Sequence, residues 1–182
     1  MLTANFGSIP NLISLFRLVL VPAIVVMIAS HRWMEACIIF IIAGISDALD
    51  GWIAKSFDLR TELGAYLDPL ADKALLVSIY IALAINQTIP AGLAIIVVAR
   101  DLMIIGAFMV SWLLDKPIRV VPLPISKLNT AAQIAFASLV LGVKAFALPA
   151  HPWFSIGVYT ITFLTLASMA AYISRWIRHM NL

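Results

Sequence analysis

Charged residues are scarce in this sequence of 182 residues, and their scarcity excludes an ordinary soluble protein. Only 12% of the residues are charged, whereas 63% are hydrophobic, and the mean hydropathy is +1.05. A soluble domain carries roughly 25% charged residues, so this chain has too few to cover a surface that faces water. The composition therefore predicts one polytopic membrane domain over residues 1–182.

Other scarce features narrow the possible functions. The single cysteine, Cys37, excludes an intrachain disulfide, and the three histidines show no spacing that would suggest a zinc site. The net charge of +3 is modest, and basic residues in membrane proteins chiefly report orientation, so we expect no nucleic-acid partner. The first ten residues lack a basic segment of the kind that precedes a signal sequence, and we expect no cleavable leader.

Long apolar segments make up most of the chain. A helix that crosses a bilayer needs about 20 mostly apolar residues, and such segments lie at approximately 11–30, 33–57, 61–85, 91–114, 126–146 and 153–177. Residues typical of turns, including several prolines, separate them. The sequence thus predicts an all-α polytopic membrane protein with six transmembrane helices.

The basic residues divide unequally between the two predicted sides of the membrane. One side has only Arg32 and Lys144. The other side holds Lys55, Arg60, Lys116, Arg119, Lys127, Arg175 and Arg178. By the positive-inside rule the second side faces the cytoplasm, or the matrix in an organelle. We therefore expect a multi-pass protein of a bacterial or mitochondrial inner membrane, with both termini on the basic side.

Four aspartates lie near or within the second and third apolar segments. Asp47 and Asp50 are three residues apart, and Asp68 and Asp72 are four apart, so each pair shares one helix face. A short turn at residues 57–60 would fold the two helices against each other. The carboxylates would then meet in one polar cavity, open to the cytoplasmic side. A single aspartate could simply mark a helix end, but four at these spacings indicate a functional site.

Four close carboxylates repel one another strongly in a medium of low dielectric constant. A divalent cation removes this repulsion, and ligands that are all oxygen atoms favour hard ions such as Mg²⁺ or Mn²⁺. The aspartate cluster therefore predicts a magnesium or manganese site.

The segment around these aspartates resembles the signature of the CDP-alcohol phosphotransferase family. Seven of eight signature positions match, and the eighth, Lys55, stands where the family normally has arginine. In order, the positions are Asp47, Asp50, Gly51, Ala54, Lys55, Gly64, Asp68 and Asp72, with the family's spacing. Lysine keeps the charge but loses the two-pronged geometry of arginine. The resemblance implies an enzyme that transfers a phosphatidyl group from CDP-diacylglycerol to an alcohol and releases CMP.

The same resemblance implies roles for individual residues. Asp47, Asp50 and Asp68 would hold one metal ion, and Asp47, Asp68 and Asp72 a second. Asp72 would also act as the general base toward the acceptor hydroxyl. The nucleotide would contact Pro10, Asn11, Gly51, Lys55, Thr61 and Gly64. For Pro10 and Asn11 an ordinary helix start is an equal alternative. By family analogy we also expect a homodimer.

Charged and polar residues in the fourth and fifth segments suggest where the acceptor binds. Arg100 and Asp101 lie deep in the fourth segment, and Lys127 and Asn129 lie at the start of the fifth. Adjacent residues on a helix point in different directions, so we expect Arg100 and Asp101 to have separate partners. Arg100, Lys127 and Asn129 are the predicted acceptor-binding residues, with the two cations directed at a phosphate.

Two branches of the family differ at these positions. Phosphatidylglycerophosphate synthases, which use glycerol-3-phosphate, typically carry further cations where this chain has Phe108 and Asn129. The pattern here resembles cardiolipin synthases of the mitochondrial type, whose acceptor is phosphatidylglycerol. We therefore favour cardiolipin formation and keep the glycerol-3-phosphate enzyme as an alternative. An ion-coupled transporter is an alternative from another class, because transporters also use intramembrane charges.

Overall fold

The fold is a bundle of six helices. The computed structural model describes residues 8–56, 62–113, 123–149 and 153–180, and in these ranges it contains helices and short turns but no strand. The helices are α1 (Ser8–Ala29), α2 (Trp33–Ser56), α3 (Glu62–Ile85), α4 (Ala91–Leu113), α5 (Pro124–Ala145) and α6 (Trp153–Met180). Each coincides with one predicted segment to within a few residues. The all-α prediction is confirmed.

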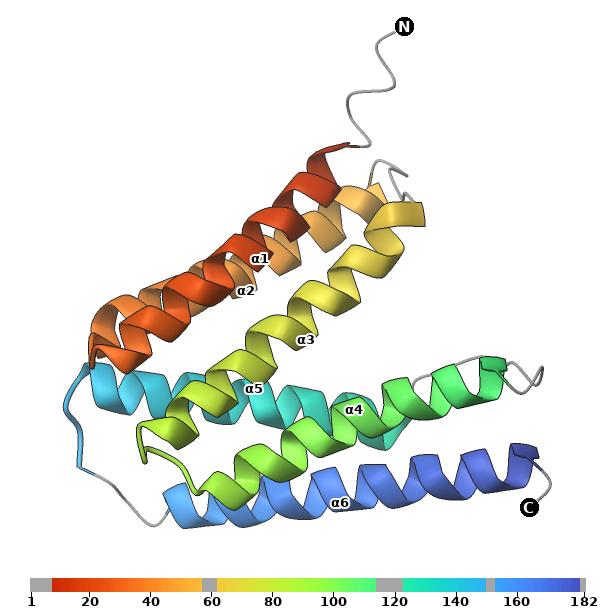
Figure 1. The fold of residues 1–182 in the computed structure, drawn as a ribbon. Coiled ribbons are helices and arrows are strands. Elements are labelled where there is room, and N and C mark those ends of the chain that lie inside the picture. The colour runs from red at the N-terminus through yellow and green to blue at the C-terminus, as the bar shows by residue number, and fades with distance from the viewer. Residues whose placement is uncertain (1–7, 57–61, 114–122, 150–152, 181–182) are drawn as a thin grey trace, which may run out of the picture.

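Successive helices run in alternating directions. In Figure 1, α1, α3 and α5 begin, and α2, α4 and α6 end, on the side of the picture where both termini lie. At the opposite end the Lys144 ammonium of α5 lies 5.6 Å from the ring centroid of Trp33 in α2, close to the turn that contains Arg32. Arg175 and Arg178 lie in the last turns of α6, at the first end. These members of the two predicted basic groups therefore lie at opposite ends of the bundle, as the sequence predicts.

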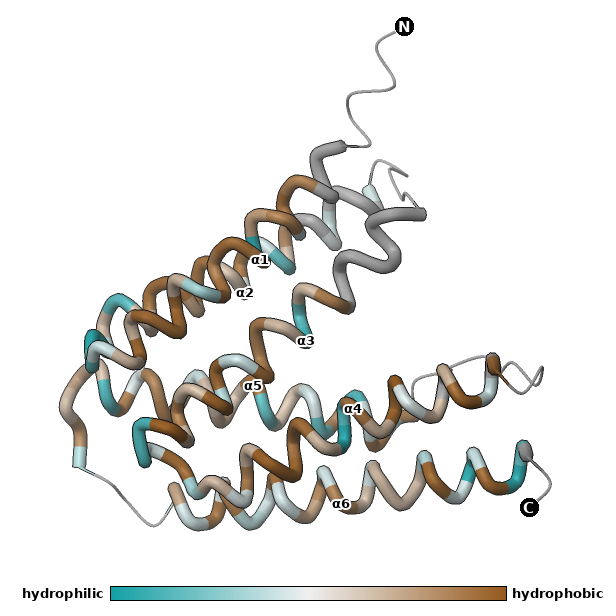
Figure 2. Tube along the Cα trace, in the orientation of Figure 1, coloured by the Kyte–Doolittle hydropathy of each residue, from teal (hydrophilic) through white to brown (hydrophobic). Residues whose placement is uncertain are grey.

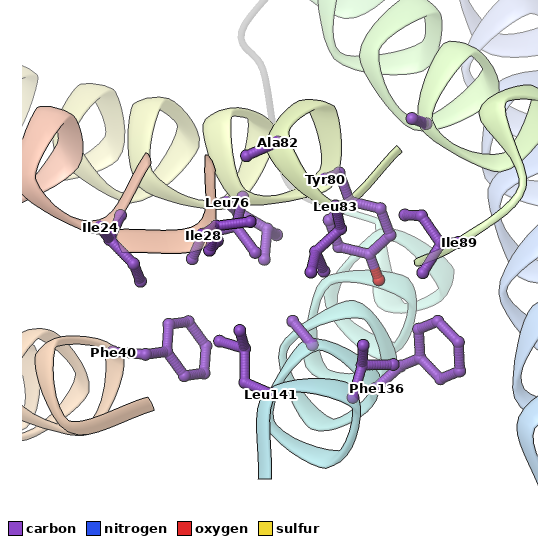
Figure 3. Close-up of a cluster of buried hydrophobic side chains, with 14 of the residues drawn as sticks. Ile24, Ile28, Phe40, Leu76, Tyr80, Ala82, Leu83, Ile89, Phe136 and Leu141 are labelled. Carbon is purple, nitrogen blue, oxygen red and sulfur yellow. The ribbon is translucent and has the colours of Figure 1, made fainter. Parts of the chain in front are cut away.

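Apolar side chains from several helices fill the centre of the bundle (Figure 3). The largest contributors are Ile24, Ile28, Phe40, Leu76, Tyr80, Leu83, Phe136 and Leu141. Tyr80 is fully buried, and its hydroxyl donates a hydrogen bond of 3.1 Å to the main-chain oxygen of Gln133. A polar group without a partner would be costly at this depth, so this bond allows a tyrosine to serve in the core and joins α3 to α5.

The outer surface of the bundle is also apolar. Val19, Ile95 and Phe163 are between 63% and 70% exposed, and apolar colouring extends over most of the helices in Figure 2. A water-facing surface of this kind would aggregate, whereas lipid solvates it. Within the described residues α1, α4, α5 and α6 are long and apolar enough to cross a bilayer. The chain is a multi-pass membrane protein. The other two helices, α2 and α3, are those that carry the four aspartates of the signature.

A turn follows each of α1, α3 and α5 at the end of the bundle opposite the termini. His31, Gln87 and Ala147 follow α1, α3 and α5, and each has a positive φ, between 50° and 56°. After α5, the amide of Leu148 donates to the carbonyl of Val143 at 3.0 Å, the bond that typically accompanies a left-handed residue after a helix. Each turn thus places a side chain where glycine is favoured.

Candidate active site

The helices α2 and α3 carry the aspartates of the signature. The helical backbone is continuous through residues 47–50 and 68–72, as their spacing requires. The described side chains are those of Asp47 and Asp72, which are 49% and 50% exposed. Asp50 and Asp68 lie on the same helices, and their side chains are outside the described residues. The structure therefore reports directly on one aspartate from each helix.

Arg17 of α1 joins these two aspartates. Its Nη1 donates a hydrogen bond of 2.6 Å to Oδ1 of Asp47 and another to Oδ1 of Asp72. The side chain of Arg17 is only 1% exposed. The interpretation of the sequence missed this residue, although a signal was present: Arg17 is the one charged residue in the apolar stretch Leu12–Ala29. A charge inside a membrane segment is functional by default.

Direct packing of α2 against α3, expected from a turn at residues 57–60, is not seen in the described part of the chain, and the turn itself lies outside the described residues. There the helix contacts of α1 are with both α2 and α3, while α2 and α3 make none with each other. Carboxylates on both helices would repel across a direct interface. The guanidinium of Arg17 supplies the positive charge that lets Asp47 and Asp72 approach the same point.

The donor chemistry at this point fits a hard divalent cation. Two carboxylate oxygens, from Asp47 and Asp72, converge on one nitrogen atom of a cation, and about half of each aspartate side chain is accessible. Carboxylate oxygens are the ligands that Mg²⁺ and Mn²⁺ prefer. The described side chains contain no group of three potential metal ligands, but the predicted set also includes Asp50 and Asp68, which are outside them.

Five of the six predicted nucleotide contacts, Pro10, Asn11, Gly51, Lys55 and Gly64, belong to helix ends near this end of the bundle. Pro10 and Asn11 belong to the first turn of α1, which begins at Ser8, so their helix-start role is observed. At Gly51 of α2 an added Cβ would meet no atom within 4 Å, which leaves space for a ligand to approach the backbone. The side chains of Pro10, Asn11, Lys55 and Thr61 and the surroundings of Gly64 fall outside the described residues.

On the predicted acceptor side, Arg100 is buried and bonded within the protein. Its side chain is 1% exposed, and Nη1 lies 2.5 Å from Oδ1 of Asp101. Nε and Nη2 donate to Oγ of Ser168 at 3.3 and 3.1 Å, and Nη2 also donates to Oγ of Ser126. The guanidinium carbon is 5.9 Å from the ring centroid of Tyr172. Arg100 of α4 is therefore a cross-link to α5 and α6.

Asp101 extends this cross-link to α3. It is 6% exposed, and its two carboxylate oxygens accept bonds of 2.8 and 2.9 Å from Nζ of Lys73. Each residue has the separate partner that was expected, Ser126 and Ser168 for Arg100 and Lys73 for Asp101, but the two residues also pair with each other. A long arginine side chain can bend back toward its neighbour, and burial leaves both charges without water. Lys73, the residue after Asp72, was missed by the interpretation of the sequence.

The other two predicted acceptor residues occupy different environments. Asn129 is fully buried, and its Oδ1 accepts a bond of 2.9 Å from the hydroxyl of Thr165. Lys127, in the first turn of α5, is exposed. The structure thus places Asn129 in the contact between α5 and α6 and leaves the ammonium of Lys127 accessible.

A groove of about 510 Å³ lies between α3 and α4. Its walls are apolar and include Ile81, Ile85, Ile95 and Leu102. Such walls suit lipid chains rather than a charged nucleotide. This groove is therefore different from the polar cavity predicted beside the aspartates.

Residues 7–169 match the sequence model of the CDP-alcohol phosphatidyltransferases. The chain belongs to the CDP-alcohol phosphatidyltransferase family. Among its relatives in this family is the cardiolipin synthase (CMP-forming) of Rattus norvegicus, which is 34% identical over 92% of this chain and 61% of its own length. The Homo sapiens enzyme of the same name is 33% identical with the same coverage.

A bacterial member of the family is also similar. The CDP-diacylglycerol–glycerol-3-phosphate 3-phosphatidyltransferase of Bacillus subtilis is 30% identical over 92% of this chain and 94% of its own length. The chain spans only about three fifths of the rat and human cardiolipin synthases. The matched residues include α2 and α3, the two helices that carry the signature aspartates.

Proposed function

We propose that this protein transfers a phosphatidyl group from CDP-diacylglycerol to phosphatidylglycerol, giving cardiolipin and CMP. The observation that carries the proposal is the meeting of Asp47 and Asp72, from two helices of the family signature, at one accessible point. Family membership supplies the reaction class. The names of the rat and human relatives support phosphatidylglycerol as the acceptor.

Asp47, Asp50, Asp68 and Asp72 would together hold two divalent ions, Mg²⁺ or Mn²⁺. Bound there, the ions would neutralise and polarise the pyrophosphate of the CDP-lipid. Pro10, Asn11, Gly51, Lys55, Thr61 and Gly64 would bind the nucleotide. The open space at Gly51 supports this role, because a ligand could lie against the α2 backbone there.

Asp72 would accept the proton of the acceptor hydroxyl as general base. The acceptor oxygen forms a bond to the phosphorus that carries the diacylglycerol, and the bond from this phosphorus to the CMP oxygen breaks. CMP leaves with that oxygen. Arg17, in contact with Asp72, holds the base where the acceptor hydroxyl would approach.

The charges on the acceptor side support a lipid phosphodiester. A phosphate monoester carries close to two negative charges at neutral pH, whereas a diester carries one. Contact of Arg100 with the acceptor would have to replace its bonds to Asp101, Ser126 and Ser168. The exposed ammonium of Lys127 therefore provides the more accessible positive charge, and one accessible cation suits a single negative charge. Asn129 would support the acceptor pocket through its bond to α6.

Synthesis of phosphatidylglycerophosphate from glycerol-3-phosphate is the second candidate. It is favoured by the Bacillus subtilis relative, which this chain matches over 94% of that relative's length. Family membership leaves the transporter alternative without a supporting observation. We also propose that the protein is a homodimer in a bacterial or mitochondrial inner membrane. Its site would face the cytoplasm or matrix, because the basic residues gather at that end.

The proposal is tested with purified protein in lipid nanodiscs, supplied with CDP-diacylglycerol, Mn²⁺ and either acceptor. We expect cardiolipin, identified by mass, and little product from glycerol-3-phosphate. Asp47→Asn and Asp72→Asn should each lose about 100-fold or more of the activity, since an amide keeps the shape but not the charge. Glu35→Gln is the matched control, because Glu35 lies at the other end of α2 and pairs with Arg32.

Two outcomes would contradict the proposal. Formation of phosphatidylglycerophosphate without cardiolipin would promote the second candidate. Normal activity in Asp47→Asn or Asp72→Asn, with Glu35→Gln also normal, would show that the reaction takes place elsewhere.

A further inference from the structure

Arg17 is a buried cation behind the two aspartates that the solvent reaches. Its side chain is 1% exposed, whereas those of Asp47 and Asp72 are 49% and 50% exposed. The guanidinium therefore approaches the carboxylates from the interior of the bundle. About half of each aspartate side chain is still accessible, so a ligand could reach it from outside the bundle.

The position of Arg17 has an electrostatic cost and an electrostatic benefit. A guanidinium in an apolar helix is stable only with counter-charges nearby, and Asp47 and Asp72 provide them. In return, Arg17 reduces the repulsion between carboxylates that come from different helices. This arrangement lets the two aspartates lie close together.

A divalent ion on the same carboxylates would lie a few ångströms from the guanidinium. Like charges at such a separation repel strongly where the effective dielectric constant is low. The ion would also have to share, or take over, carboxylate oxygens to which Arg17 now donates hydrogen bonds. Both effects oppose ion binding.

We propose that Arg17 is a built-in counter-cation of the aspartate site, which holds Asp47 and Asp72 in place before an ion binds and weakens the binding of that ion. This inference rests on the metal site of the proposed function. It makes Arg17 a positioning residue. Because an anionic substrate would offset the repulsion between the ion and Arg17, the site should favour ions that arrive together with such a substrate.

The test measures Mn²⁺ binding directly, by electron paramagnetic resonance of free Mn²⁺, and thermal unfolding followed by tryptophan fluorescence. Arg17→Gln removes the charge and keeps a hydrogen-bonding group. We expect this variant to melt below the wild type in chelator, to regain most of the difference in saturating Mn²⁺, and to bind Mn²⁺ at least about tenfold more tightly. Arg17→Lys keeps the charge and should stay within about threefold of the wild-type affinity.

Arg32→Gln is the matched control, because Arg32 is an exposed arginine paired with Glu35. It should leave Mn²⁺ affinity unchanged. Equal or weaker Mn²⁺ binding by Arg17→Gln would overturn the inference. So would failure of Arg17→Gln to fold even in saturating Mn²⁺, since the ion should replace the missing charge.

The measurements also separate this inference from the proposed function. If Mn²⁺ neither binds nor stabilises the wild type, and Asp72→Asn behaves identically, then the proposed metal site fails. If Mn²⁺ binds the wild type and Asp72→Asn abolishes this binding, the metal site stands. Arg17→Gln alone then decides the role of Arg17.

Discussion

Replacement of Asp101 by asparagine should destabilise the protein severely. The Asp101 carboxylate is 6% exposed and is shared by Arg100, at 2.5 Å, and by Lys73, at 2.8 and 2.9 Å. Asparagine keeps the size of the side chain but leaves the guanidinium of Arg100, 1% exposed, without a buried counter-charge. Removal of one partner from a buried ion pair costs about 3–5 kcal/mol.

The two partners of Asp101 should contribute unequally. Lys73 is 35% exposed, so water screens its charge and Lys73→Met should cost only about 1 kcal/mol. Most of the stability lost in Asp101→Asn therefore comes from the broken ion pair with Arg100. In a chain of this size each kcal/mol lowers the melting temperature by about 2–4 °C, so Asp101→Asn should melt about 6–20 °C below the wild type.

Thermal unfolding in nanodiscs, followed by tryptophan fluorescence, measures these differences. In the double variant Asp101→Asn, Lys73→Met the two costs should not add, because the residues touch; a coupling of about 0.5–3 kcal/mol is expected. An unchanged melting temperature for Asp101→Asn would refute the assignment of Asp101 as the counter-ion of Arg100. Fully additive costs would refute its pairing with Lys73.

Two further predictions concern backbone positions. Gly157→Ala should cost about 1–3 kcal/mol of stability, because the added Cβ would lie 2.5 Å from the buried ring of Phe136. The control Gly142→Ala, where an added Cβ meets open space, should be neutral or stabilising in the same melting assay. Ala147→Gly should raise stability by up to about 1 kcal/mol, because Ala147 has a φ of 50°, a conformation that glycine adopts without strain. The control Ala135→Gly, inside α5, should lower stability by a similar amount. A loss of stability in Ala147→Gly, or none in Gly157→Ala, would contradict these explanations.

The helices could be predicted from the sequence because each one is coded locally. A run of about 20 apolar residues can satisfy its backbone in lipid only as a helix, and prolines and polar residues mark where each run ends. The six predicted segments therefore match α1 to α6 closely. The helical spacing of Asp47 with Asp50, and of Asp68 with Asp72, needed no more than this local information.

Contacts between helices could not be predicted in the same way. Lipid solvates apolar side chains as well as a neighbouring helix does, so hydropathy does not specify which helices pack together. The expected contact between α2 and α3 is absent from the described part of the chain for this reason, and α1 packs against both helices there. The pairing of Arg100 with Asp101 was likewise missed, because a rule about helix faces ignores the reach of a long side chain.

The sequence by itself determined the membrane class, the six helices, and the signature that joins this chain to its family. The tertiary structure decided which charges meet: Arg17 with Asp47 and Asp72, and Lys73 with Asp101. These residues are 28 to 55 positions apart in the chain, so no local pattern connects them. They pair because a charge in a low-dielectric interior is stable only beside its opposite. Only the packing of α1 against α2 and α3, and of α4 against α3, brings those opposites within reach.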